Sequence, residues 1–234
     1  MTPGMPRGGR PWAAPDAGAG RASGPLTDHW YWRTGWGVGT RYLIWYLTWE
    51  DHGDVHDHVA PFSDALRRVP SLDVVPVEWL HTTVQGVGHV GGFPPERVTA
   101  LADGAARALA GCRPPVVRLA RPEPLREAVA LELDPDGCLD ELVQAVRAAT
   151  AEALGESAMQ DAWPRPAFPH LSLAYAAGLV AREQVDATLA AVPDCVVETT
   201  VRAVSLVELH RDHRQYEWRP VARVPVGTGT PPHA

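Results

Sequence analysis

Two short segments of the sequence combine a histidine with a hydroxyl residue two positions later: His81 with Thr83, and His170 with Ser172. If each segment is a strand, side chains two residues apart point to the same face, about 6.6 Å from each other. Each histidine then stands beside its hydroxyl. Two imidazoles can divide the roles of base and acid near neutral pH, and hydroxyls can bind phosphoryl oxygens. The pattern therefore predicts a site that handles phosphate.

Both motifs occur in segments that favour a strand on other grounds. Residues 74–87 and 168–175 are rich in aliphatic and aromatic side chains, which are typical of strands. The motifs lie 89 residues apart, one in each half of the chain, and a predicted helix follows each. A histidine two residues before a hydroxyl often arises by chance, so this shared context gives the pattern its weight.

Length and charge exclude several classes of protein. A chain of 234 residues suits one domain, or one domain of two lobes. A net charge of −7 argues against an extensive nucleic-acid coat, although it permits a local phosphate site. All 21 basic residues are arginine. The absence of lysine excludes Schiff-base enzymes, P-loops with their lysine, and ligases that adenylylate a lysine.

Cysteines and targeting signals give further limits. Cys112, Cys138 and Cys195 are widely spaced and form no C-x-x-C, which favours neither a disulfide framework nor a thiolate zinc site. No apolar run approaches the ~20 residues of a membrane span, and the N-terminus has no signal-peptide core. We expect a cytoplasmic protein with no membrane contact and no obligate protein partner, and the oligomeric state stays open.

The predicted elements alternate between strands and helices. We expect a disordered leader at 1–28, rich in Gly, Pro, Ala and Arg, a domain at 29–226 and a flexible tail at 227–234. Within the domain, 116–120 and 128–133 are predicted to be neighbouring strands, and the last two strands to form a hairpin. The pattern indicates an α+β fold. Strands are expected at 41–49, 74–87, 116–120, 128–133, 168–175, 196–209 and 216–226, and helices at 61–69 (opened by Pro61), 94–109, 139–153 and 182–192.

At its two motifs the sequence resembles the two-histidine (2H) phosphoesterase superfamily, which contains 2′-5′ RNA ligase-like proteins and cyclic phosphodiesterases. HTTV at 81–84 and HLSL at 170–173 carry the likeness to the HxTx motif, and PHLSLAY at 169–175 is particularly close. The resemblance spans about 41–226. It implies two pseudo-symmetric lobes of mostly antiparallel sheet with helices, which flank a central cleft and contribute one motif each.

The resemblance also implies a chemistry that needs no metal and no cofactor. By this likeness His170 is the general base toward water, His81 is the general acid toward the leaving oxygen, and Thr83 and Ser172 bind the phosphate. Thr82 stands where the family more often has an aliphatic residue, and Ser172 replaces the more common threonine. Neither departure removes a catalytic group.

These observations lead to a functional prediction. We expect a phosphodiesterase that hydrolyses a 2′,3′-cyclic phosphate of a nucleotide or RNA end. Reversible 2′-5′ RNA ligation is the reverse of the same chemistry and needs no ATP. A non-catalytic nucleotide- or RNA-binding module that uses the same cleft is the alternative.

A second alternative is a metal hydrolase. His52, His56 and His58, with the acidic residues between them, form the densest group of potential metal ligands in the chain. A polar loop that caps the next helix explains the same residues.

Other residues border the predicted site. If the strands are regular, Gln85 lies on the same face as His81 and could line the cleft. Tyr175 then lies on the face opposite His170 and is expected to pack in the core. Arg211 and Arg214 belong to the charged turn of the last hairpin and could reach a ligand. Five tryptophans near the N-terminus suit either burial or a wall on which bases stack: Trp30, Trp32, Trp36, Trp45 and Trp49.

Overall fold

The computed structural model describes residues 24–32, 35–133, 136–155 and 168–227. The α-helices among them are α1 (Gly53–Leu66), α2 (Pro95–Leu109), α3 (Asp140–Leu154) and α5 (Arg182–Ala190), and two short 3-10 helices are η1 (Val77–Trp79) and η2 (Val90–Gly92). The strands are β1 (Tyr42–Thr48), β2 (Leu72–Val74), β3 (His81–His89), β4 (Val116–Leu119), β5 (Glu123–Pro124), β6 (Ala128–Glu132), β7 (His170–Ala176), β8 (Val197–Thr200), β9 (Ala203–His210) and β10 (Glu217–Pro225).

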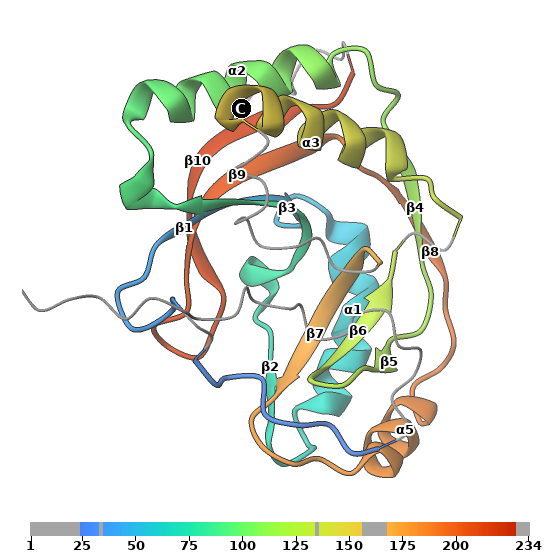
Figure 1. Cartoon of the computed structure of the whole chain (residues 1–234). Helices are drawn as coiled ribbons and strands as arrows, with labels where there is room; N and C mark the ends of the chain where they lie inside the picture. Colours follow the sequence, from blue (N-terminus) through green and yellow to red (C-terminus); the bar gives the residue numbers. More distant parts are fainter. Residues whose placement is uncertain (1–23, 33–34, 134–135, 156–167, 228–234) are drawn as a thin grey trace, which may run out of the picture.

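The first lobe is built on a four-stranded antiparallel sheet with the order β10-β9-β1-β3. Strand β1 has the sequence YLIWYLT, whose aliphatic and aromatic side chains favour a buried strand. Helices α2 and α3 pack against each other, and they contact β10 and β3 respectively. Both helices therefore cover the same face of this sheet (Figure 1).

The second lobe repeats this plan with a sheet of the order β2-β7-β6-β5, which is again antiparallel. Helix α1 packs on β7, and α5 contacts α1 and β5. Each lobe thus pairs four strands with two helices. The predicted α+β fold with two lobes of antiparallel sheet is confirmed.

The chain passes repeatedly between the lobes. Strand β2 joins the second sheet, β3 returns to the first, and β9 and β10 complete the first sheet after β7. A separate two-stranded sheet pairs β4 with β8. Strand β3 lies at the edge of its sheet and contacts β7 of the other lobe. This contact brings the two motif strands together (Figure 1).

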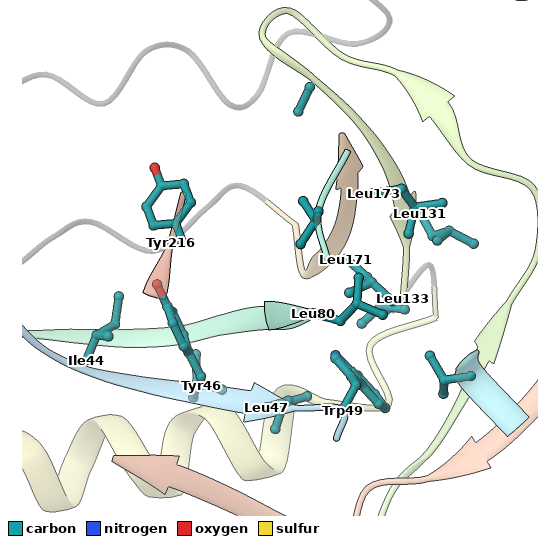
Figure 2. Close-up of a cluster of buried hydrophobic side chains, with 14 of the residues drawn as sticks. Ile44, Tyr46, Leu47, Trp49, Leu80, Leu131, Leu133, Leu171, Leu173 and Tyr216 are labelled. Atoms are coloured by element: carbon teal, nitrogen blue, oxygen red, sulfur yellow. The ribbon is translucent and has the colours of Figure 1, made fainter. Parts of the chain in front are cut away.

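One hydrophobic core connects the lobes. Its fully buried side chains include Trp45 and Trp49 from the first lobe and Leu131 and Leu171 from the second. Figure 2 shows part of this core, with side chains from both sheets in one cluster. A shared core holds the lobes, and the motif strands on them, in a fixed relation.

Five predictions about the elements were wrong. The single strand expected at 74–87 is divided into the end of β2, η1 and β3, and the strand expected at 196–209 is divided into β8 and β9. Helix α1 begins at Gly53, so Pro61 lies inside it; Pro61 is exposed, and water can replace the hydrogen bond that proline cannot donate. Strand β4 pairs with β8 and not with the strand at 128–133. The predicted leader extends too far, because Leu26 is buried and pairs with Val180.

Residues 1–23 of the predicted leader, and the tail beyond residue 227, lie outside the described residues. Among the described helices, none combines the length and the apolar character that a membrane span requires.

Candidate active site

His81 and His170 occupy the first positions of β3 and β7. In the first sheet His81 pairs with Thr48, and Thr83 pairs with Tyr46. In the second sheet the pairing of β6 with β7 places His170 and Ser172 on one face in the same way. The alternation predicted for both motifs is present, and His170 lies close enough to His81 to lower its pKa.

Each motif strand carries a β-bulge directly after its hydroxyl residue. Pairing along β3 passes from Tyr46 opposite Thr83 to Trp45 opposite Gln85, which leaves Val84 as an extra residue. On β7, Leu173 is the extra residue after Ser172. A bulge bends a strand and redirects the side chains that follow, and bulges are common beside active sites. The two motifs therefore resemble each other in backbone irregularity as well as in sequence.

The bulges overturn two predictions about neighbouring residues. Gln85 pairs with Trp45, on the face opposite Thr83, and its side chain is buried and donates to the carbonyl of Gly86. Tyr175 pairs with Ala128 and shares the face of Ser172. Because an extra residue reverses the two-residue alternation, Gln85 turns away from the site and Tyr175 turns toward it.

Both motif histidines make the same hydrogen bond, from the ring to the backbone carbonyl two residues earlier. Nδ1 of His81 lies 2.8 Å from the carbonyl oxygen of Trp79, and Nδ1 of His170 lies 3.1 Å from that of Phe168. A carbonyl oxygen only accepts hydrogen bonds, so each Nδ1 carries the hydrogen. In the neutral rings the lone pair is then on Nε2, which is the atom left for proton transfer.

Burial favours the neutral form of both imidazoles. The pKa of His81 is lowered to about 4, mainly by desolvation; the hydrogen bond to the carbonyl of Trp79 opposes this shift, and nearby His170 and His29 add to it. Desolvation also lowers the pKa of His170. A phosphate anion beside these rings favours their charged form, so ligand binding is expected to raise both pKa values.

The lowered pKa of His81 predicts a pH-dependent stability. Between pH 6.5 and about 4 the unfolded chain binds a proton at His81 that the folded chain does not, so stability falls as the pH falls through this window. The expected loss is about 3 kcal/mol. Urea unfolding at pH 7 and pH 4 should show a loss smaller by about this amount in His81→Gln. His213→Gln, at an exposed histidine, is the control, and equal losses in wild type and His81→Gln would contradict the prediction.

Tyr46 supports both polar groups of the first motif. Its ring stacks on the His81 imidazole with a centroid separation of 4.3 Å and an angle of 25°. Its hydroxyl makes a side-chain hydrogen bond with Thr83, and burial raises the Tyr46 pKa well above 10.0. The phenol therefore stays protonated, and it can either donate to or accept from the Thr83 hydroxyl.

An aromatic wall surrounds His81. Tyr216 and Trp218 place their ring centroids 5.5 and 5.3 Å from that of His81, both edge to face. Figure 2 shows Tyr46 rising from β1 toward Tyr216. These rings exclude water from one side of the imidazole, which explains the desolvation of His81.

The sequence analysis missed a third histidine, His29. Its Nδ1 faces Glu127 at 3.2 Å and its Nε2 faces the hydroxyl of Tyr216 at 2.9 Å. The ring stacks on Tyr175 at 4.2 Å. His29 falls in a stretch next to the predicted leader, so its only signal was its position among the aromatic residues that precede the first strand.

The alternative metal site at residues 52–58 is not formed. His52 bonds to Thr199, His56 to the carbonyl of Trp49, and His58 to the carbonyl of Ala120. Within the described ranges, no three His, Cys, Asp or Glu side chains are arranged to hold a metal ion. Because His56 and His58 lie on α1 and not on a loop, the helix directs them to different partners.

Two antiparallel lobes that each present a histidine and a hydroxyl define the architecture of the two-histidine phosphoesterases. The chain belongs to the 2′-5′ RNA ligase superfamily, whose family model matches residues 55–213. This is a superfamily of phosphoesterases and RNA ligases, as the sequence motifs indicate.

Solved structures share the fold. TT0787 of Thermus thermophilus is 20% identical with a TM-score of 0.64, over 80% of this chain and 100% of that chain. E. coli LigT complexed with 3′-AMP is 15% identical with a TM-score of 0.55, over 80% of this chain and 98% of that chain. LigT complexed with phosphate is 18% identical with a TM-score of 0.52, with the same coverage. A search of curated proteins gives no match.

Proposed function

We propose that this protein hydrolyses a phosphodiester, namely a 2′,3′-cyclic phosphate of a nucleotide or RNA end, by acid–base catalysis between His81 and His170. The observation that carries the proposal is the repeated unit on the two motif strands. In each unit a backbone carbonyl fixes the tautomer of the histidine so that Nε2 is available, and a hydroxyl lies on the same face.

The proposed reaction divides the proton transfers between the lobes. Nε2 of His170 takes a proton from water as the water oxygen attacks phosphorus. This assignment requires His81 to take up a proton at Nε2 as the anionic substrate binds, because its pKa is otherwise about 4. His81 then gives this proton to the ribose oxygen as the P–O bond breaks. Thr83 and Ser172 donate to the phosphoryl oxygens, where negative charge develops. The product is a ribose phosphomonoester with one free hydroxyl, and exchange with solvent resets both rings.

The reverse direction uses the same groups. A ribose hydroxyl in place of water joins two RNA ends without ATP, which fits a chain that has no lysine to adenylylate. Structures of LigT contain 3′-AMP and ATP, so a relative with this fold binds nucleotides. That precedent supports a nucleotide or RNA end as the substrate.

Treatment with EDTA distinguishes the proposed chemistry from metal hydrolysis. Purified protein incubated with 2′,3′-cyclic nucleotides is expected to open the ring at the same rate before and after EDTA treatment, because the two imidazoles supply both proton transfers. Chromatography follows the reaction and identifies whether the 2′- or the 3′-phosphate forms. Loss of turnover in EDTA would indicate a metal hydrolase, and tight binding without turnover would indicate a binding module.

A further inference from the structure

A cavity of about 280 Å³ lies between the N-terminal segment at 24–32 and the turn that connects β9 to β10. The segment lies outside the part of the chain that the family model matches. It is fixed to the second lobe by backbone hydrogen bonds between Leu26 and Val180 and from His29 to Ala176. The cavity is lined by Asp28, Trp30, Trp32, Ala177, Arg211, Asp212 and Arg214.

The deepest cationic group of this cavity has unused donors. Arg211 is 2% exposed, and its Nη2 donates to the carbonyl of His29 at 3.0 Å. Its Nε and Nη1, together with Nε1 of Trp30, have no hydrogen-bond partner among the described residues. Leaving buried N–H groups unpaired is costly, and all three groups are donors. These atoms have almost no accessible surface, so a ligand rich in acceptor oxygens pairs with them only when the Arg211 side chain shifts toward the cavity.

The charges around the cavity favour an anion. Asp212 already accepts from the backbone N–H of Gly39 at 2.8 Å and pairs with Arg41 at 2.9 Å. Asp28 accepts from the backbone N–H of Trp30. Arg214 is largely exposed and only loosely paired with Asp73, at 3.6 Å, so it is free to turn toward a ligand. Neither carboxylate therefore neutralises Arg211.

Aromatic surface complements this charge. Trp32 is 47% exposed and lines the cavity, so one face of its indole is open to a ligand. The guanidinium of Arg211 lies over the rings of Trp30 and Tyr216, at 5.3 and 5.1 Å. An exposed indole beside arginine donors is the combination on which proteins stack bases and hold the attached phosphate.

The cavity is one aromatic layer away from the candidate active site. The Tyr216 ring lies 5.1 Å from the Arg211 guanidinium on one side and 5.5 Å from the His81 ring on the other. The guanidinium and the imidazole are therefore at most about 11 Å apart. A chain of one or two nucleotides is long enough for this separation, and it would pass around the edge of the Tyr216 ring.

We propose that this cavity is a subsite for a second nucleotide, the one next to the nucleotide whose phosphodiester lies between His81 and His170. Arg211 and Arg214 hold its phosphate, and Trp32 stacks on its base. The proposal rests on the proposed function and deepens it, because it assigns the substrate to RNA ends of at least two nucleotides rather than to free cyclic mononucleotides.

Binding of adenosine 5′-monophosphate tests the subsite without any catalysis. Isothermal titration should show affinity at least tenfold weaker in Trp32→Ala and in Arg214→Ala than in wild type. Both residues are exposed, so neither substitution should affect folding. Tyr31→Ala, at an exposed neighbour that does not line the cavity, and Arg219→Ala are the matched controls, and both should bind as wild type does. No binding by wild type, or equal binding by all five proteins, would overturn the proposal.

Kinetics then test the place of the subsite in the reaction. Wild type is expected to have a kcat/KM about tenfold or more higher for a dinucleotide ending in a 2′,3′-cyclic phosphate than for the cyclic mononucleotide. This ratio should fall toward one in Trp32→Ala and Arg214→Ala and stay unchanged in the two controls. A wild-type ratio near one would overturn the proposal. If neither substrate reacts, the proposed function fails, whereas the binding experiment still decides on the subsite.

Discussion

Replacing either His81 or His170 with alanine is expected to lower kcat for phosphodiester hydrolysis by about 10³-fold. Each residue supplies one of two proton transfers in the same step, so the loss of either one removes a transfer that the other cannot perform. Ring opening of a 2′,3′-cyclic nucleotide at saturating substrate measures the loss. Because the chemical step is affected, kcat should fall far more than KM changes.

Two comparisons make this result specific. His213→Ala removes an imidazole that is exposed and lies outside the motif strands, and it should retain wild-type turnover. Circular dichroism should show that both motif variants fold. A motif variant that folds and keeps more than about a tenth of wild-type kcat would remove that histidine from the mechanism.

The second large loss of kcat is expected when the hydroxyl beside each histidine is removed. Thr83→Val and Ser172→Ala are each expected to lower kcat by about 10²-fold, because a donor to the developing charge on the phosphoryl oxygens is lost. Ser172 is 4% exposed, so water cannot easily take the place of its hydroxyl, and Thr83 is half-buried beside the Tyr46 hydroxyl.

Thr83→Ser keeps the hydroxyl and should recover most of the activity that Thr83→Val loses. Thr188→Val, on the exposed surface of α5, controls for the general effect of the substitution and should be silent. If KM rises while kcat is unchanged in Thr83→Val and Ser172→Ala, the hydroxyls bind the ground state only, and their role in the transition state is contradicted.

Much of the fold and the central pair of motifs could be predicted because the signals are local. Alternation along a strand places His81 with Thr83, and His170 with Ser172, from the sequence alone. The apolar stripes of α2 and α3 repeat with the helical period, so both helices were predicted within a residue or two of their bounds. The family resemblance then supplied the two-lobed arrangement that local patterns do not contain.

The positions of Gln85 and Tyr175 could not be predicted in this way. A β-bulge is defined by the partner strand, because the extra residue exists only relative to the register across the sheet. Val84 and Leu173 have no local signal that marks them as extra. Sequence alternation was therefore correct up to each hydroxyl residue and reversed beyond it.

His29 and Arg211 were underestimated for a similar reason. They are 182 residues apart, and the contact between the Arg211 guanidinium and the His29 carbonyl exists only after the N-terminal segment lies on the second lobe. His29 directly follows the predicted leader at 1–28, and Arg211 was placed in the charged turn of the last hairpin, from which it could reach a ligand. Long-range packing brings both residues against Tyr216: His29 faces its hydroxyl, and Arg211 lies over its ring.

A double-mutant cycle on the two histidines tests the central claim most directly. Single-turnover rates for a 2′,3′-cyclic nucleotide are measured in wild type, His81→Ala, His170→Ala and the double variant. If the imidazoles act as one acid–base unit, the double variant should be about as slow as either single variant. Losses that multiply, to about 10⁶-fold in the double variant, would show that the histidines act independently and would contradict the account.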